Sequence, residues 1–309
     1  RSSRRKRRRK RSSSARSGQL RIVFAGTAMF AQWSLNRLIE AGHDIVLVIT
    51  QPDRVAGRGL RVLAPAIKLL ASERGLLVFQ PERIKDPVAQ DRIRELAPDV
   101  MIVVAFGQIL PASLLGLPRL GTLNVHGSLL PRHRGAAPVE WAILSGDSET
   151  GVTIMQMDAG VDTGPILAQA RTQIAPDETA GPLTGRLGEM GARLLVRTLH
   201  ALALDEISAT PQPEVGATQA PRLRSEDGKL KPDEMSATEI DRRVRALAER
   251  LGCWMTLNGV ELKILKGHRG GEPGQGIPVE TVEGVYFVDE VQPPGGRRMS
   301  AAAWARGRR

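Results

Sequence analysis

Cysteine is nearly absent from this chain, since Cys253 is the only one among 309 residues. A single thiol excludes an intrachain disulfide framework and a cysteine-based zinc cluster, and it fits a reducing compartment. Long apolar runs are missing as well. None approaches the roughly 20 residues that a transmembrane helix needs, so the sequence predicts a soluble protein that does not enter a membrane.

Acidic residues are missing from positions 1–18, which contain ten lysines or arginines. These ten charges account for most of the formal net charge of +11. The segment lacks the apolar stretch of a secretory signal, although a nuclear-localisation signal is formally compatible with it. Because like charges repel and nothing in the segment can be buried, we predict a disordered basic leader that attracts phosphate without reading a sequence.

Apolar segments alternate with amphipathic ones from residue 20 onward. Strand-like segments at 20–26 and 44–50 flank a helical pattern at 30–42, which is the beginning of a β-α-β arrangement. Further helices are predicted at about 65–74 and 87–96, and further strands at 76–80, 99–107 and 121–127. These strands are apolar without alternation, so they predict a mostly parallel sheet with helices on both faces and a ligand site at its carboxyl edge. Residues 151–157 alternate, as an antiparallel strand does.

The second half of the chain changes in composition. After a helix predicted at about 181–203, residues 205–221 are rich in Pro, Thr and Gly and read as a linker. One helix at 236–251 and several short strands then predict a small OB-like β-barrel. The predicted fold class is therefore α/β, with a Rossmann-like catalytic domain at 19–204, the linker, and a C-terminal β-barrel domain at 222–309.

Asn124 and His126 lie on one face of a predicted strand, at its carboxyl end. An asparagine amide can donate to an oxygen that becomes negative, and a neutral histidine can move a proton near neutral pH. The following turn, 128–132, is held by Pro131 and can offer backbone groups to a flat ligand. Taken alone, an Asn-x-His pair is more often a turn cap beside a buried, hydrogen-bonded histidine than a catalytic site.

Two carboxylates, Asp158 and Asp162, lie on the glycine-rich segment 157–167. One of them could orient His126 and stabilise its cationic form, or either could simply form an Asx turn. The ligand spacing of an EF-hand is absent, and so are an H-E-x-x-H motif and a Cys/His cluster. The sequence therefore predicts no catalytic metal.

A long basic loop, residues 50–68, follows the second strand. Its Gly-Arg-Gly is not a dinucleotide-binding fingerprint, because it follows the wrong strand and lacks a third glycine. By composition alone the loop fits a solvated surface as well as a phosphate contact. Its cationic side chains are Arg54, Arg58, Arg61 and Lys68.

Five segments, in order along the chain, resemble the methionyl-tRNA formyltransferase family among the folate-dependent formyltransferases. They are AGTAMFA (25–31), TQPDRVAGRG (50–59), VAFGQILP (104–111), LNVHGSLLPRHRGAAP (123–138) and ETGVTIMQMDAGVDTG (149–164). The resemblance continues less closely to VQPPGGRRMSAAAW at 291–304. Ala28 and Met29 replace the Pro and the acidic residue usual in the family, and His133 replaces an aromatic residue.

The resemblance implies transfer of the formyl group of 10-formyltetrahydrofolate to the α-amino group of methionyl-initiator tRNA. Asn124 would stabilise the tetrahedral oxyanion, His126 would move the proton, and Asp162 would hold His126 and its charge. The turn that matches the family's folate-facing turn consists of Ser128, Leu129, Leu130 and Pro131. The loop that matches its tRNA contact carries Arg54, Arg58, Arg61 and Lys68.

The same resemblance implies a monomeric, bacterial-type cytoplasmic enzyme, with an organellar matrix as the alternative location. Its partners would be tRNA and folate. It would bind neither a metal nor a membrane. Two other functions stay open on the residues alone. A formyltransferase acting on an amino-sugar nucleotide or on glycinamide ribonucleotide would work without tRNA. A non-catalytic RNA-binding protein would not depend on Asn124 or His126.

Overall fold

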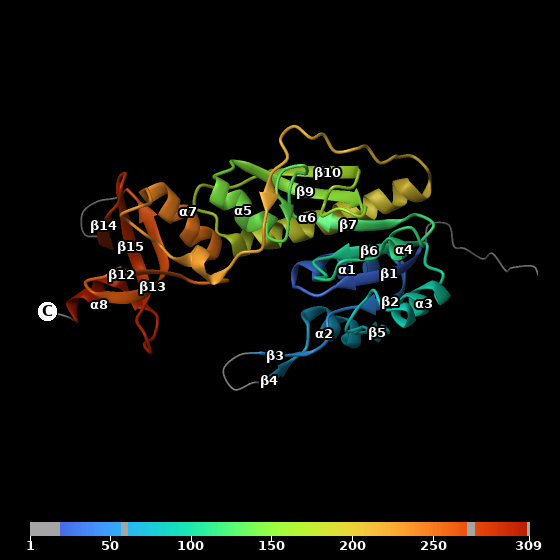
Figure 1. Cartoon of the computed structure of the whole chain (residues 1–309), viewed down its shortest axis with the longest axis horizontal. Coiled ribbons are helices and arrows are strands. Elements are labelled where there is room, and N and C mark those ends of the chain that lie inside the picture. Colours follow the sequence, from blue (N-terminus) through green and yellow to red (C-terminus); the bar gives the residue numbers. More distant parts are fainter. Residues whose placement is uncertain (1–18, 57–60, 271–275, 308–309) are drawn as a thin grey trace, which may run out of the picture.

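A seven-stranded sheet forms the centre of the first part of the chain (Figure 1). The computed structural model describes residues 19–56, 61–270 and 276–307, so the predicted leader and Arg58 lie outside the described residues. The strand order is β10-β9-β7-β6-β1-β2-β5. Five of these strands run parallel: β1 (Arg21–Gly26), β2 (Asp44–Ile49), β5 (Val78–Phe79), β6 (Val100–Val104) and β7 (Thr122–His126).

Two antiparallel strands complete one edge of this sheet. Strand β9 (Glu149–Gln156) pairs with β7, and β10 (Ile166–Gln173) pairs with β9. The predicted α/β class is confirmed, and so is the antiparallel strand expected from the alternation at 151–157. Strand β7 consequently lies where parallel pairing gives way to antiparallel pairing.

Alternate residues of β1 enter two different cores. Ile22 and Phe24 belong to the core that includes α1 (Phe30–Glu40), α2 (Ala66–Glu73) and α6 (Ala180–Ala203). Val23 and Ala25 belong to the core that includes α3 (Pro87–Glu95) and α4 (Ala112–Leu115). Both sides of the strand are therefore covered, which explains why its sequence is apolar without alternation.

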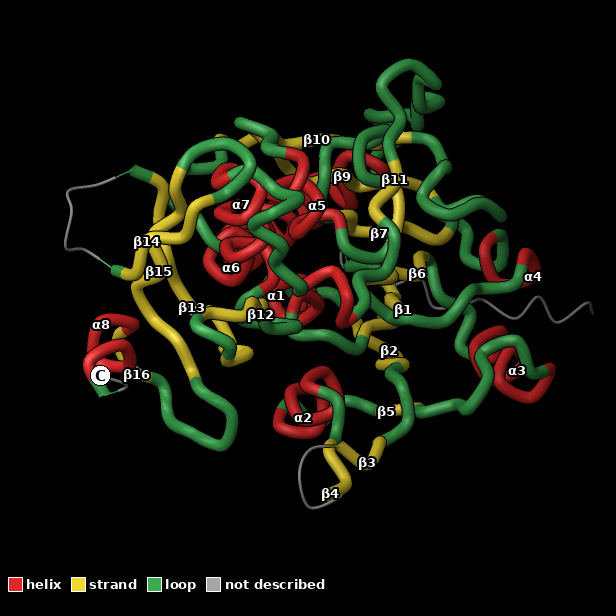
Figure 2. Tube along the Cα trace, turned by 60° about the vertical axis from the view of Figure 1, so that its left-hand side comes forward, coloured by secondary structure: helices red, strands yellow, loops and turns green. Residues whose placement is uncertain are grey.

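The end of the chain, for which the sequence predicts a small β-barrel, forms an antiparallel half-barrel. Its sheet order is β12-β13-β15-β14, with β16 on β15. The strands are β12 (Cys253–Leu257), β13 (Val260–Arg269), β14 (Ile277–Glu280), β15 (Val285–Gln292) and β16 (Met299–Ser300), followed by α8 (Ala301–Arg306). Helix α7 (Ala237–Leu247) lies between this sheet and α5 (Pro138–Ser145) (Figure 2), and one continuous hydrophobic core joins them.

Four short strands escape the sequence pattern because they are too short to show a period. The basic loop contains a hairpin of β3 (Arg54–Ala56) and β4 (Arg61–Leu63), which projects beside α2 in Figure 1. The predicted linker contains β11 (Gln219–Ala220), which pairs in parallel with β8 (Arg134–Gly135).

Across the described ranges, no helix combines the length and the hydropathy needed to cross a bilayer.

Candidate active site

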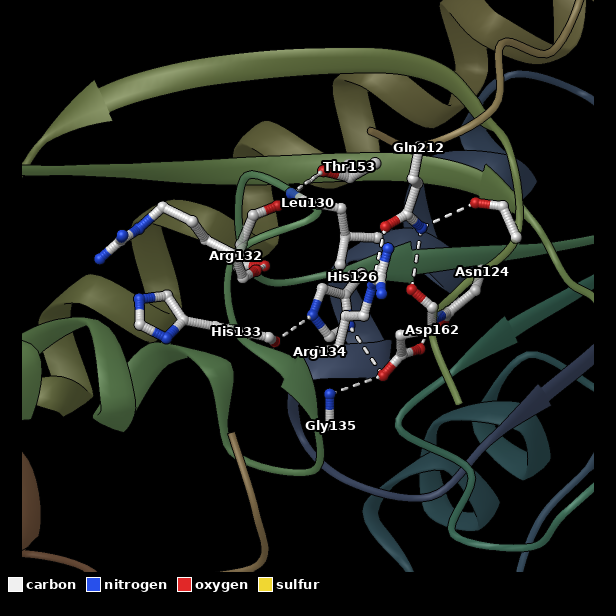
Figure 3. Close-up of polar contacts among 12 residues, drawn as sticks. Asn124, His126, Leu130, Arg132, His133, Arg134, Gly135, Thr153, Asp162 and Gln212 are labelled. Atoms are coloured by element: carbon white, nitrogen blue, oxygen red, sulfur yellow. Dashed lines mark hydrogen bonds and ion pairs between the residues drawn. The ribbon is translucent and has the colours of Figure 1, made fainter. Parts of the chain in front are cut away.

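Asn124 and His126 project from the end of β7 toward a loop that follows β9 (Figure 3). Both side chains lie in the protein interior, with 9% of Asn124 and 5% of His126 exposed. The strand's pleat places alternate residues on one face, which brings the amide and the imidazole together. Buried polar groups require hydrogen-bond partners, so the partners of these two side chains determine which chemistry the side chains can perform.

Asp162 connects these two side chains. Asn124 Nδ2 donates to Asp162 Oδ1 at 3.1 Å, and the Gly135 backbone N–H donates to Asp162 Oδ2 at 2.9 Å. The same Oδ2 lies 3.6 Å from His126 Nδ1. Asp162 has a φ of +53°, a conformation uncommon outside glycine, and this conformation belongs to the turn that presents the carboxylate to β7.

The partners of His126 identify its tautomer. Its Nε2 lies 2.9 Å from the backbone oxygen of His133. A carbonyl oxygen can only accept, so Nε2 carries a hydrogen and donates it. In the neutral imidazole, Nδ1 then carries the lone pair and is the nitrogen able to take a proton. A proton on Nδ1 would face the Asp162 carboxylate, which stabilises the cationic ring.

The second predicted carboxylate has a different place. Asp158 Oδ1 accepts hydrogen bonds from the Gly160 backbone N–H at 3.0 Å and from Thr163 Oγ1 at 2.8 Å. These are the contacts of an Asx turn, which shapes the glycine-rich loop. Of the two candidates, Asp162 is therefore the carboxylate beside His126.

The turn at 128–131 uses most of its polar groups internally. Thr153 Oγ1 accepts from the Leu130 N–H at 3.1 Å and donates to the Ser128 carbonyl at 2.7 Å. Gln169 Nε2 donates to the Leu130 carbonyl at 2.8 Å, and the Ser128 hydroxyl donates to the Arg132 carbonyl at 2.6 Å. Ser128 and Leu130 are buried, whereas Leu129 and Pro131 are half-buried. A ligand can thus reach this turn through its apolar side chains more readily than through its backbone.

A hollow of about 530 Å³ lies behind this turn. It is lined by Leu129 to His133 together with residues 146–150 and Gln169, and neither Asn124, His126 nor Asp162 lines it. The three candidate residues therefore lie outside this hollow. We place the candidate site at Asn124, His126 and Asp162, because an amide donor, an imidazole and a carboxylate converge there at the carboxyl end of β7.

His133 and Arg132, which directly follow this turn, both bind Asp147. His133 Nε2 lies 2.7 Å from Asp147 Oδ2, and Arg132 Nη2 lies 2.5 Å from Asp147 Oδ1. Burial acts to raise the pKa of Asp147, but the hydrogen bonds and charges of His133 and Arg132 outweigh it and lower that pKa. This arrangement fixes His133, whose carbonyl oxygen holds His126.

The residues expected to contact tRNA fall into three groups. Arg54 is exposed on β3, and its Nη2 donates to Gln51 Oε1 at 3.3 Å. Lys68 lies on α2 and forms an ion pair of 2.5 Å with Asp53, so its charge already has a partner. Arg61 belongs to β4, but its side chain, like the whole of Arg58, lies outside the described residues.

Sequence reasoning missed several residues that hold the site. Thr153 and Gln169 support the turn at 128–131, and Gln212 donates to the backbone of the Asp162 loop. Arg134 and Gly135 belong to the quoted HRGAAP segment, so they could have been named from it. Gln212 stands in a segment read as a linker and carried no such signal. The described ranges contain no cluster of three or more side chains suited to a metal ion.

Comparison with known proteins shows which family the chain resembles. The formyl transferase family model matches residues 20–199, and the model of the formyl transferase C-terminal domain matches residues 222–309. A protein of Halorhodospira halophila named methionyl-tRNA formyltransferase is 47% identical over 301 residues, which cover 94% of this chain and 96% of the relative. One of Myxococcus xanthus with the same name is 46% identical over 303 residues, covering 93% and 95%.

Solved structures share the fold at low identity. The N-formyltransferase of Helicobacter canadensis, in complex with folinic acid and dTDP-3-aminofucose, has a TM-score of 0.67 at 19% identity, covering 91% of this chain and 100% of that one. HypX of Aquifex aeolicus, in complex with tetrahydrofolic acid, has a TM-score of 0.64 at 16% identity, covering 93% of this chain and 47% of that one. With the two family models matched over most of its length, this chain belongs to the formyl transferase family.

Proposed function

We propose that this protein transfers the formyl group of 10-formyltetrahydrofolate to the α-amino group of methionyl-initiator tRNA. The observation that carries the proposal is the Asp162 carboxylate, which joins the Asn124 amide and the His126 imidazole at the end of β7. The names of the relatives from Halorhodospira halophila and Myxococcus xanthus support the tRNA acceptor. The folate complex of HypX agrees with a folate-derived donor.

In the proposed reaction the methionyl amine attacks the formyl carbon and forms a tetrahedral intermediate. His126 Nδ1 takes the proton that the amine nitrogen releases, because Nε2 is already committed to the His133 carbonyl. Asp162 stabilises the resulting imidazolium. The bond from the formyl carbon to N10 of the folate then breaks, and the imidazolium gives its proton to N10, so that tetrahydrofolate leaves and His126 is neutral again.

Asn124 has the donor that the intermediate needs. Its amide has two N–H groups, and one of them donates to Asp162 Oδ1. The second is available for the oxygen that becomes negative when the amine adds. A donor fixed in advance costs no reorganisation at the transition state, and the loss of such a donor typically costs about 10²–10³-fold in kcat.

The binding surfaces follow from the same assignment. Ser128 to Pro131 form the folate-facing turn, with Leu129 and Pro131 as its accessible side chains. Arg54, Arg58, Arg61 and Lys68 of the basic loop contact tRNA, and Lys68 also forms an ion pair with Asp53. We further propose boundaries at 19–204 for the catalytic domain, 205–221 for the linker and 222–309 for the tRNA-binding domain, and a monomeric enzyme of the cytoplasm.

A formyl-transfer assay tests this function. Radiolabelled 10-formyltetrahydrofolate should give a formylated product with charged methionyl-initiator tRNA, and none with uncharged initiator tRNA. Product with an amino-sugar nucleotide or with glycinamide ribonucleotide, and none with charged tRNA, would assign the protein to another acceptor. Tight RNA binding without any transfer would indicate a non-catalytic RNA-binding protein.

A further inference from the structure

The linker runs along the active site instead of bypassing it. Thr210 pairs with Ile166 by two backbone hydrogen bonds of 2.8 Å, close to the Asp162 loop. Farther along, the Thr218 hydroxyl accepts from the His133 N–H at 2.8 Å, and the Thr218 carbonyl accepts from the Arg134 N–H at 2.9 Å. His126 lies between the Asp162 carboxylate and the His133 carbonyl. The linker therefore touches the segments that supply both partners of the histidine.

Gln212 is a linker side chain that lies within this arrangement, beside Asp162 and Arg134 (Figure 3). Its Nε2 donates to the Asp162 carbonyl at 2.8 Å and to the Gly164 carbonyl at 2.7 Å. These two bonds hold the backbone on either side of the turn in which Asp162 adopts its positive φ. The loop has two glycines, Gly160 and Gly164, and an exposed outer surface, so a clamp on its backbone directly restricts where the carboxylate can lie.

Arg134 orients the Gln212 amide. The Arg134 side chain is only 7% exposed, and its Nε donates to Gln212 Oε1 at 3.0 Å. With the amide oxygen directed at this donor, the amide nitrogen must face the two carbonyl groups. A reversed amide would direct its oxygen at both carbonyls and leave the arginine N–H unpaired. The network thus specifies one orientation of Gln212.

We propose that Gln212 is a positioning residue for Asp162, so that the linker between the two predicted domains is part of the active site. The inference rests on the proposed role of Asp162 in formyl transfer. It assigns to Gln212 no contact with either substrate. Displacing a catalytic group by about 1 Å can cost on the order of 10²-fold in rate, which sets the expected effect.

Two substitutions separate positioning from general support of the fold. Gln212→Ala removes both donors and the acceptor. Gln212→Glu keeps an oxygen for Arg134 but replaces the amide nitrogen with an oxygen facing two carbonyls. Both variants should lose on the order of 10²-fold in kcat, with little change in either KM. Gln219→Ala is the matched control, because this exposed linker glutamine makes no side-chain hydrogen bond within the described ranges, and it should retain wild-type kcat.

A double-mutant cycle with Asp162→Asn completes the test, with circular dichroism and thermal melting confirming that every variant is folded. If Gln212 acts through Asp162, then Gln212→Ala should add little loss in the Asp162→Asn background. If Gln212→Ala lowers kcat by the same factor in the Asp162→Asn background as in the wild type, or if Gln212→Glu keeps wild-type kcat, this inference is wrong. The proposed function is left in place by either result. Wild-type kcat for Asp162→Asn alone overturns both the proposed role of Asp162 and the inference built on it.

Discussion

The Asp162 carboxylate accepts from Asn124 and Gly135 and faces His126, so removing its charge should disturb the reaction more than the fold. We expect His126→Ala and Asp162→Asn each to lower kcat by about 10²–10⁴-fold, the usual range for general acid–base groups. The affinity for methionyl-tRNA should change little, because both groups act on the transition state. Single-turnover formyl transfer and equilibrium tRNA binding measure the two quantities.

Asp158→Asn provides the control for this prediction. Asp158 lies on the same loop and undergoes the same chemical change, but its oxygens accept from Gly160 and Thr163 rather than facing the histidine. It should keep nearly normal turnover. Equal losses for Asp158→Asn and Asp162→Asn would mean that the loop's folding, and not the Asp162 charge, limits the rate.

Asp147 gives a residue-scale prediction about pH. Burial acts to raise the folded pKa of Asp147, but His133 and Arg132 hold that pKa below its ordinary value. A depressed carboxyl pKa contributes stability that is present above the unfolded pKa and is lost as pH falls through the folded pKa. At pH 7, Asp147→Asn should lower the free energy of unfolding by about 1–3 kcal/mol, as expected for hydrogen bonds to a charged group. The difference from wild type should shrink below about pH 4.

Urea unfolding at a series of pH values measures this difference. Glu149→Gln is a suitable comparison, because its ion pair with Arg171 joins two exposed side chains, and such pairs contribute about 0–1 kcal/mol. If the cost of Asp147→Asn stayed constant down to pH 3, the Asp147 charge would not be the source of the stability.

At the scale of elements, α1 and α6 approach each other through Trp33 and two helical glycines. A Cβ built on Gly188 would lie 2.6 Å from Trp33 Cε3, whereas one built on Gly185 would lie 3.9 Å from Trp33 Cζ2. Gly188→Ala should therefore force the indole or the helix to move and cost about 1–3 kcal/mol. Gly185→Ala has room for its methyl group, and it should stabilise the helix by up to about 1 kcal/mol.

Thermal or urea unfolding of the two variants compares the same substitution one turn apart on the same helix. The expected order of stability is Gly185→Ala, wild type, Gly188→Ala. A Gly188→Ala variant as stable as Gly185→Ala would show that the α1–α6 contact can loosen without cost. The close helix packing would then not contribute to the stability of the fold.

At the scale of the whole molecule, residues 1–18 contribute ten cationic side chains and no acidic one. Ten cations without an apolar anchor can neutralise phosphates but cannot read bases. Deleting residues 1–18 should weaken binding of initiator and elongator tRNA alike. It should also flatten the dependence of affinity on salt, since fewer counterions are released. Salt titrations of both tRNAs, with and without the leader, measure this effect.

The ratio of initiator to elongator tRNA affinity shows whether the leader attracts all RNA alike or recognises the initiator tRNA. It should stay unchanged on truncation if selectivity resides in the β3–β4 hairpin and in the placement of the half-barrel beside α5 and α7. A selective loss of initiator binding would instead make the leader a recognition element. Nonspecific binding that kept its original salt dependence would argue that the leader does not contact RNA.

Much of the fold followed from local pattern. The unalternating strands at 20–26 and 44–50 required cover on both faces, and α1, α2 and α6 on one side with α3 and α4 on the other supply it. The alternation at 151–157 marked the antiparallel β9. The hairpin β3–β4 and the pairing of β8 with β11 did not follow, because strands of two or three residues show no period, and β11 lies about 85 residues beyond β8 in the chain.

The sequence by itself determined that Asn124 and His126 share the carboxyl end of one strand, because a strand's pleat is a local property and its alternation places both on one face. It also carried the family's motifs, and these motifs named Asp162. Only the tertiary structure decided that Asp158 turns away, that Lys68 is paired with Asp53, and that Gln212 holds the Asp162 loop from 50 residues farther along the chain. Such contacts depend on where the folded chain passes, and no local spacing encodes the path of a linker across an active site.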